Sequence, residues 1–292
     1  MKRIVVLHSD RSEDIITPVV KRLRRNPMFV VEESHPSADI NSSADLVIAP
    51  FDRPEVVMAA VRAFYMGIPI AQVHAGDFST GGSFDDVGRH LITLMSTIQF
   101  CVGHRAYRRV CQLLSLVGKS TKHVYKINSI SLDDLKVDVS LCPSPAFEYD
   151  LVVYNSPTGH LEVIESELHV IIRMLGKNVV WILPSGGSVG DAEISRYVKL
   201  LLKSRPDATV YSSVSRPMFL GLMKYCNRFI GNSSSMFYDA PYFLKKGKIV
   251  HVGVRNTGRE YVKLKPGGSD QIVQILEEYF KGEGKSMKWR KK

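Results

Sequence analysis

The stretch His74-Ala-Gly-Asp-Phe-Ser-Thr-Gly-Gly-Ser-Phe-Asp-Asp-Val-Gly-Arg-His90 decides the fold, because an apolar run ends there in a group of ionisable and glycine residues. The run before it, Ile68-Pro-Ile-Ala-Gln-Val73, is typical of a strand with both faces covered. From Asp85 to Phe100, apolar residues recur near helical spacing. This order of strand, polar turn and helix predicts a parallel α/β sheet with a site where the strand ends.

Chemically active side chains gather at this turn, namely His74, Asp77, Asp85 and Arg89. Asp85 and Arg89 fall on the first turn and a half of the predicted helix. One alternative is that Asp85 or Asp86 only caps the helix, a position that aspartate favours. Capping leaves His74, Asp77, Arg89 and His90 together unexplained, so the turn is a candidate site.

The composition points to a globular protein with an anionic ligand. With 292 residues, the length favours two domains of roughly 150 residues each. The net charge of +10 suits an anionic partner, but the basic residues are dispersed except at Lys21–Arg25 and in the tail Lys285–Lys292. Because no zinc-finger spacing or RNA-binding signature is present, we expect phosphate on a small ligand and no nucleic acid.

The cysteines and the hydropathy pattern bear on where the protein works. Cys101, Cys111, Cys142 and Cys226 have no paired metal-ligand spacing and follow no secretory signal, so we expect reduced thiols in a cytoplasmic protein. No apolar run approaches the roughly 20 residues that a membrane span requires, so we expect no membrane association.

Strand and helix patterns alternate through both halves of the chain. Strands are expected at residues 1–7, 29–31, 44–49, 68–74, 99–103, 122–126, 149–154, 179–183, 209–211, 228–230 and 248–252. Helices are expected near residues 14–25, 54–66, 107–116, 161–175 and 192–203. The alternation predicts two doubly wound, mostly parallel Rossmann-like domains with a cleft between them. The proline-containing stretch 141–148 predicts a linker, which gives domains at residues 1–145 and 146–292, the second with the basic tail.

A second candidate site follows a strand of the second half, at Gly231-Asn-Ser-Ser-Ser235. A strand that leads through this turn into a helix aims backbone N–H groups and hydroxyls at one point, with the helix dipole behind them. A diphosphate fits such a site, whereas the alternative is an ordinary helix cap by Asn232 or Ser233. Arg255 and Arg259 follow the next strand and are candidates to reach the same phosphates.

Six motifs in order resemble the UDP-N-acetylglucosamine 2-epimerases, and among them the hydrolysing branch. They are Asp52-Arg53-Pro-Glu55, His74-Ala-Gly-Asp77, Asp85-Asp-Val-Gly-Arg-His-Leu-Ile-Thr93, Gly231-Asn-Ser-Ser-Ser235, Asp239-Ala-Pro-Tyr-Phe243 and Val252-Gly-Val-Arg-Asn-Thr-Gly-Arg259. Asp77 and Asp239 each stand where the branch carries glutamate, which is one methylene longer. The resemblance implies two domains of the glycosyltransferase-B type, with a UDP-sugar in the cleft, and a homodimer.

The resemblance also implies a reaction. Loss of UDP from the anomeric carbon, with removal of the C2 proton, gives a glycal, and addition of water or of UDP then gives N-acetylmannosamine or its UDP conjugate. Carboxylates near C1 and C2 and cations on the leaving diphosphate serve such chemistry. No metal or redox cofactor is required, because the substrate brings its own leaving group.

By matched position, the resemblance assigns roles to individual residues. The acid/base and charge-stabilising candidates are Asp52, Asp77 and Asp85, with Arg89 and His74 holding them or the sugar. The candidates that bind UDP are Arg11, Arg53, Ser233, Ser234, Ser235, Asp239 and Arg255, of which Arg11 faces the uridine or its phosphates and Asp239 the ribose hydroxyls.

Two other functions stay open at this point. A small glycosyltransferase of the same two-domain type would keep the phosphate site without needing three carboxylates. A nucleotide-sugar-binding protein that has lost catalysis would accommodate Asn155 and Leu94, which stand where the family has a histidine and a lysine. The exact sugar, and the choice between hydrolysing and non-hydrolysing chemistry, are likewise open.

Overall fold

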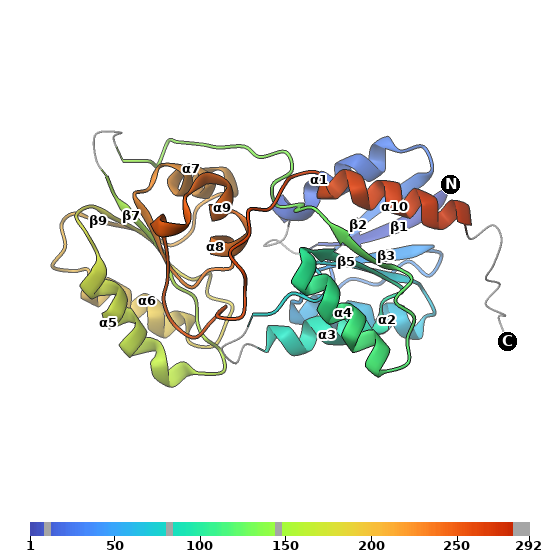
Figure 1. Cartoon of the computed structure of the whole chain (residues 1–292), viewed down its shortest axis with the longest axis horizontal. Helices are drawn as coiled ribbons and strands as arrows, with labels where there is room; N and C mark the ends of the chain where they lie inside the picture. Colours follow the sequence, from blue (N-terminus) through green and yellow to red (C-terminus); the bar gives the residue numbers. More distant parts are fainter. Residues whose placement is uncertain (9–12, 80–83, 144–147, 283–292) are drawn as a thin grey trace. The chain divides into compact units, whose positions relative to one another are not determined.

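The computed structural model describes residues 1–8, 13–79, 84–143 and 148–282. They form two compact units (Figure 1). The first unit comprises the described residues of Met1–Asp77, Val87–Asp134 and Lys265–Lys292, and the second comprises those of Phe78–Asp86 and Leu135–Leu264. Each unit holds one parallel sheet with helices on both faces, which confirms the predicted fold class.

The sheet of the first unit has six strands in the order β2-β1-β3-β4-β5-β6, and every neighbouring pair is parallel. The strands are β1 (Lys2–Leu7), β2 (Phe29–Ser34), β3 (Leu46–Pro50), β4 (Ile70–Val73), β5 (Ile98–Val102) and β6 (Val124–Ile127). Every residue of β3, β4 and β5 is buried, as expected for strands covered on both faces.

Helices cover this sheet from both sides. They are α1 (Glu13–Arg25), α2 (Pro54–Tyr65), α3 (Asp85–Met95), α4 (His104–Leu116) and α10 (Gly268–Gly282). Figure 1 shows α1 and α10 side by side on one face of the sheet, with α2, α3 and α4 on the other.

The last described helix, α10, belongs to the first unit although it is last in the chain. Its buried residues Ile272, Leu276 and Phe280 recur every fourth position, and the Phe280 ring lies 6.0 Å from that of Phe29 at the start of β2. The sequence alone predicts that this segment belongs to the domain of residues 146–292. The contacts divide the chain differently, because the apolar face of α10 is buried against elements from the beginning of the chain.

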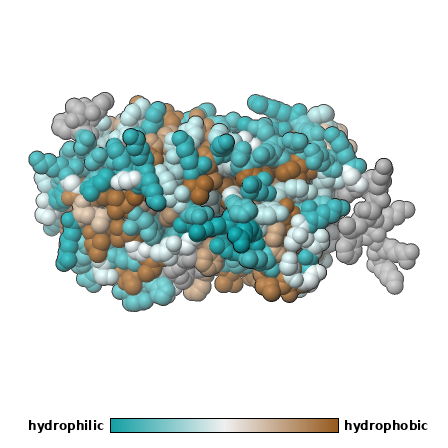
Figure 2. Space-filling view, viewed as in Figure 1, coloured by the Kyte–Doolittle hydropathy of each residue, from teal (hydrophilic) through white to brown (hydrophobic). Residues whose placement is uncertain are grey.

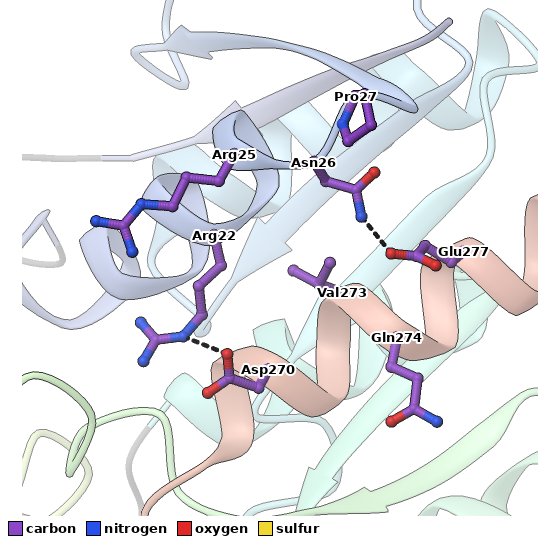
Figure 3. Close-up of a pocket in the computed structure, with 8 residues that line it drawn as sticks. All are labelled: Arg22, Arg25, Asn26, Pro27, Asp270, Val273, Gln274 and Glu277. Carbon is purple, nitrogen blue, oxygen red and sulfur yellow. Dashed lines mark hydrogen bonds and ion pairs between the residues drawn. The ribbon is translucent and has the colours of Figure 1, made fainter.

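Polar contacts also join α10 to α1 along an open groove of about 480 Å³ (Figure 3). Arg22 of α1 donates to Asp270 at 2.8 Å and to Asp134 at 2.9 Å. Asn26 and Glu277 point toward each other across the groove and are hydrogen bonded. The groove is therefore a junction between two helices, in which Arg22 is already paired with carboxylates.

The second unit has five parallel strands in the order β11-β10-β7-β8-β9. They are β7 (Asp150–Val153), β8 (Val179–Ile182), β9 (Ala208–Tyr211), β10 (Arg228–Gly231) and β11 (Ile249–His251). The helices are α5 (Ile164–Met174), α6 (Asp191–Leu201), α7 (Arg216–Tyr225), α8 (Ser235–Tyr238) and α9 (Ala240–Phe243), with short 3₁₀ turns at Leu161–Val163 and Lys246–Lys248. One core lies under α5 and α6 and another under α7, α8 and α9.

In each sheet the chain reverses its direction of winding at one place. In the first unit this place lies between β1 and β3, and in the second between β7 and β10. Parallel α/β sheets bind ligands at the carboxyl ends of strands at such switch points. Asp52 follows β3, Asn155 follows β7, and the turn Asn232–Ser235 follows β10, so the strand order places these residues where ligands are expected.

On the face shown in Figure 2, hydrophobic patches are broken up by hydrophilic residues. Among the described residues, no helix combines the length and apolar character needed to cross a bilayer.

Candidate functional site

The first unit has a strained backbone at the carboxyl ends of β3 and β4. Pro50 and Val73 are register partners at the ends of these strands, and the residues that follow, Phe51 and His74, both have positive φ angles, of 65° and 63°. Positive φ is uncommon for residues other than glycine and is concentrated at functional sites. The two rings pack together with centroids 5.1 Å apart. The contact between the two rings therefore helps to hold the backbone at this edge of the sheet.

A buried ion pair lies next to this edge. Arg89 of α3 binds the carboxylate of Asp52 through Nη2, and the two side chains are only 5% and 17% exposed. The other terminal nitrogen, Nη1, donates to the main-chain oxygen of Asp77 at 2.9 Å. One guanidinium thus connects the residues that follow β3 and β4, and brings together three of the residues singled out from the sequence.

The position of α3 is itself fixed by a buried glutamine. Gln72 of β4, which is fully buried, donates to the main-chain oxygen of Arg89 at 2.9 Å and accepts from the Thr93 hydroxyl at 2.7 Å. The strand thereby holds one turn of the helix through a side-chain amide. This contact explains a polar residue inside an otherwise apolar strand.

Two further residues bear on this site, Arg109, which the sequence did not single out, and His90, to which it gave no role. Arg109 of α4 donates to the main-chain oxygen of Gly76 at 2.5 Å. His90 follows Arg89 on α3, and burial together with the positive charges of Arg89 and Arg109 holds its pKa below the ordinary value of 6.5. No sequence signal links α4 to this turn, because the contact joins residues more than thirty positions apart.

In the second unit, the Gly231–Ser235 turn is built on a close approach of two strands. Gly231 has a φ of 137°, and a Cβ there would lie 2.0 Å from the main-chain oxygen of Val153, so only glycine fits. The fully buried Asn232 accepts from the backbone N–H of Asn155 at 2.7 Å and donates to the Asn155 oxygen at 2.8 Å. The turns after β7 and β10 are therefore locked together.

The serines of this turn contact one another. The hydroxyls of Ser233 and Ser235 lie 2.8 Å apart, and the backbone N–H of Ser235 donates to Ser233 Oγ at 3.3 Å. The sequence predicts a helix dipole behind these groups, but α8 has only four residues. Since a macrodipole builds up over several turns, hydroxyls, backbone N–H groups and nearby cations are the stronger features for an anion here.

Arg255 supplies such a cation. Its guanidinium donates to the main-chain oxygen of Ser156 at 3.0 Å and to Asp85 at 3.2 Å, all within the second unit. The adjacent Asn256 donates through its side chain to the main-chain oxygen of Asn232 and through its backbone N–H to that of Ser79. The segment after β11 thus connects the turns after β7 and β10 with Ser79 and Asp85.

The other residues that the sequence singled out lie as follows. Asp239 is 4% exposed and accepts from Arg216 of α7 at 2.9 Å, a partner that sequence reasoning missed. Arg53 immediately precedes α2 and donates to Glu55 at 2.8 Å. Ser234 is exposed and immediately precedes α8. Arg11 lies outside the described residues.

The candidate site residues supply carboxylates, guanidinium groups, an imidazole and hydroxyls. Within that part of the chain, no group of three or more histidine, cysteine, aspartate or glutamate side chains has an arrangement that could hold a metal ion.

Residues 37–289 match the family model described as UDP-N-acetylglucosamine 2-epimerase. The chain belongs to this family. The match extends over most of both units and includes all six motifs quoted from the sequence. The resemblance inferred from those motifs is therefore confirmed.

Curated relatives of this family are similar to the chain over most of its length. It is 24% identical over 245 residues to the UDP-N,N'-diacetylbacillosamine 2-epimerase (hydrolyzing) of Legionella pneumophila, which corresponds to 80% of this chain and 61% of the relative. It is 27% identical over 228 residues to the GDP/UDP-N,N'-diacetylbacillosamine 2-epimerase (hydrolyzing) of Campylobacter jejuni, 74% of this chain and 58% of the relative. The matched part is thus about six-tenths of the length of these relatives.

The fold is shared with solved structures of the family. The UDP-GlcNAc 2-epimerase of Neisseria meningitidis, solved bound to UDP-GlcNAc, superposes with a TM-score of 0.70 at 14% identity. The superposition covers 96% of this epimerase-family chain and 92% of the Neisseria chain. At this identity the likeness establishes the two-domain architecture and no residue roles.

Proposed function

We propose that this chain is an enzyme that eliminates UDP from a UDP-linked 2-acetamido sugar and completes a 2-epimerisation through a glycal. The observation that carries the proposal is that two of the six family motifs, Asp52–Glu55 and Gly231–Ser235, lie at the carboxyl ends of strands at the switch points of the two sheets. Addition of water to the glycal would release the free manno sugar, and addition of UDP would give its nucleotide conjugate.

In the first unit, Asp52, Asp77 and His74 would act at the sugar. Elimination needs a base at C2 and negative charge near the oxocarbenium-like C1, which carboxylates supply. The buried Arg89 keeps Asp52 in place and holds the main chain of Asp77, which supports a role in orienting both carboxylates. Asp85, although it packs with the second unit, is the third carboxylate of the proposal.

In the second unit, Ser233, Ser234, Ser235 and Arg255 would bind the diphosphate. A guanidinium and several hydroxyl and N–H donors stabilise the charge that develops on UDP as it leaves. Asp239 would accept hydrogen bonds from the ribose while it shares its carboxylate with Arg216. Arg11 and Arg53 complete the proposed UDP ligands, by the positions that the resemblance assigns to them.

The names of the relatives suggest which sugars to test. The Legionella relative is named for UDP-linked N,N'-diacetylbacillosamine, and the Campylobacter relative for the GDP- or UDP-linked form of the same sugar. The Neisseria structure contains UDP-GlcNAc. All of these are nucleotide-linked 2-acetamido sugars. We therefore propose this substrate class, with UDP-GlcNAc as the first member to assay.

We also propose that the protein acts in the cytoplasm as a homodimer that needs no metal or redox cofactor. The four cysteines are unpaired, which suits a reducing compartment. The chemistry needs no cofactor because UDP is already a good leaving group. The homodimer rests on family membership, and light scattering of the purified chain tests it.

The function is tested by measuring UDP release and sugar products from UDP-GlcNAc and from UDP-N,N'-diacetylbacillosamine. Asp52→Asn, Asp77→Asn and Asp85→Asn should each reduce turnover by about 100-fold or more, as expected for acid/base groups. Retention of most activity in all three variants would contradict the epimerase mechanism and favour a glycosyltransferase. UDP binding without turnover in the wild type would point to a binding protein.

A further inference from the structure

A carboxylate outside the proposed site lies buried beneath the segment that carries Arg255. Glu167 of α5 is 8% exposed, whereas Glu165 on the same helix is exposed to solvent. Glutamate is rarely buried in this way, because removing its charge from water is costly unless hydrogen bonds or a cation compensate. The position of Glu167 therefore requires an explanation beyond helix packing.

Both carboxylate oxygens of Glu167 are used. The hydroxyl of Tyr154, the residue immediately after β7, donates to Oε2 at 2.7 Å. The backbone N–H of Val254 donates to Oε1 at 2.9 Å. One side chain thus joins the end of β7 to the turn that follows β11.

The turn is shaped to accept this carboxylate. Gly253 has a φ of 95°, and a Cβ at this position would lie 2.1 Å from Glu167 Oε2. The absence of a side chain at residue 253 therefore lets the carboxylate reach the N–H of Val254. On the other side of the turn, the ring of His251 donates through Nε2 to the main-chain oxygen of Arg255 at 2.6 Å.

These contacts fix the main chain directly before Arg255, whose guanidinium reaches Ser156 and Asp85. The hydrogen-bond partners of Glu167 are the hydroxyl of Tyr154 and the backbone N–H of Val254. Burial, together with the hydrogen bond and the negative charge of Glu167, raises the pKa of Tyr154 well above its ordinary value, while Arg255 opposes that rise. Tyr154 therefore stays protonated as a donor to Glu167.

We propose that Glu167 is a positioning residue, which directs the Arg255 guanidinium by fixing the Gly253–Arg255 turn. The inference deepens the proposed function, since it rests on Arg255 as a ligand of the leaving diphosphate. It assigns to Glu167 no contact with substrate. Its effect on the ligand is exerted entirely through the direction of Arg255.

The first test compares Glu167→Ala with Glu165→Ala by hydrogen–deuterium exchange of the ligand-free protein. Glu165 is a matched control, because it lies on the same helix as Glu167 and accepts its hydrogen bond from a side chain, the Tyr197 hydroxyl of α6 at 3.3 Å. We expect the amide of Val254 to exchange at least about tenfold faster in Glu167→Ala and at the wild-type rate in Glu165→Ala. Equal exchange in all three proteins would overturn the proposal.

The second test measures UDP affinity by calorimetry in a double-mutant cycle. Glu167→Ala and Arg255→Ala should each raise the Kd of UDP by about tenfold. The Kd of the double variant should exceed that of Arg255→Ala by less than about twofold, because both changes remove the same interaction. Glu167→Gln should restore most of the affinity, because its amide can accept from Val254 and donate to Tyr154. Additive losses, or a Glu167→Gln variant as weak as Glu167→Ala, would contradict a positioning role.

A folding defect in Glu167→Ala is handled by a milder variant. Tyr154→Phe removes one of the two hydrogen bonds of Glu167 and should raise the Kd of UDP by about threefold. Combined with Arg255→Ala, it should raise the Kd little beyond that of Arg255→Ala alone. If the wild type does not bind UDP, the proposed function fails, while the exchange of Val254 still decides whether Glu167 fixes the turn. The two failures are therefore distinguishable.

Discussion

The guanidinium of Arg255 lies 3.2 Å from the carboxylate of Asp85, within the second unit. Both residues are candidates for the same reaction, Arg255 as a ligand of the diphosphate and Asp85 as an acid/base or charge-stabilising group. A guanidinium has a fixed fork of N–H donors, and a phosphate oxygen would compete with Asp85 for them. Binding of the diphosphate would therefore release this carboxylate from its ion pair.

The first prediction concerns this competition. Asp85→Asn should bind UDP more tightly by up to about fivefold, since a partly exposed ion pair of this kind contributes up to about 1 kcal/mol. The same variant should lose about 100-fold or more in turnover if Asp85 acts on the sugar. Calorimetry and a UDP-release assay measure the two effects.

The matched control for Asp85→Asn is Asp39→Asn, which makes the same change in net charge at an exposed residue of the first unit. Its UDP affinity should equal that of the wild type. Weaker binding of UDP to Asp85→Asn would show that Asp85 does not compete for Arg255.

The second prediction concerns two ion pairs of different burial. The Asp52–Arg89 side chains are 17% and 5% exposed, whereas those of Glu55 and Arg53 are 27% and 33% exposed. Removing one partner of a buried pair leaves an uncompensated charge, so Arg89→Met should lower the free energy of unfolding by about 3 kcal/mol or more. Arg53→Met should lower it by less than about 1 kcal/mol.

Urea denaturation of Arg89→Met and Arg53→Met, followed by far-UV circular dichroism, measures both free energies. Equal losses in the two variants would show that the Asp52–Arg89 pair is no more important to the fold than a surface pair.

Much of the candidate site was predictable from sequence because it follows strands that are themselves apparent. Asp52, His74 and the Gly231–Ser235 turn come directly after apolar runs, and parallel strands carry such residues to one edge of a sheet. Arg109, Arg216 and Glu167 were not predicted. Each reaches its partner from a helix that is distant in sequence, and the contact depends on how helices pack, which no local pattern encodes.

The third prediction concerns α10. Leu276 is fully buried against the first unit, so Leu276→Ala should lower the free energy of unfolding by about 2–5 kcal/mol. Gln274→Ala, at an exposed position of the same helix, should change it by less than about 0.5 kcal/mol. Chemical denaturation of both variants provides the measurement, and a neutral Leu276→Ala would contradict the packing of α10 against the first unit.

The apolar positions of α10 recur at helical spacing, so its formation was within reach of sequence reasoning. Its place in the first unit was not, because the residues it covers lie at the other end of the chain. The division of the chain into units therefore depends on a long-range contact, whereas the alternation of strands and helices is local. This difference explains why the fold class was predicted correctly while the structure places α10 in a different unit from the one expected.

The fourth prediction concerns pH. The pKa of His90 is lowered from its ordinary value of 6.5 by burial and by Arg89 and Arg109. Below pH 6.5 the unfolded chain therefore binds a proton at His90 that the folded chain does not, so this residue contributes stability above pH 6.5 that is lost as the pH falls. His90→Asn should show a smaller loss of unfolding free energy between pH 7.5 and pH 5.5 than the wild type.

The control for the pH experiment is His169→Asn, because His169 is exposed to solvent on α5. Its pH dependence should match that of the wild type. A wild-type-like pH dependence in His90→Asn would contradict the proposed environment of His90.

The central claim is that the enzyme removes the C2 proton of a UDP-linked 2-acetamido sugar as UDP leaves. Proton NMR of the protein with UDP-GlcNAc in D₂O tests it most directly, with Asp52→Asn as the control. We predict deuterium at C2 and a new manno anomeric signal in the wild type, and neither in Asp52→Asn, with accumulation of free UDP if water completes the reaction. A wild-type spectrum in which UDP-GlcNAc binds but shows no exchange at C2 and no new sugar would contradict the account.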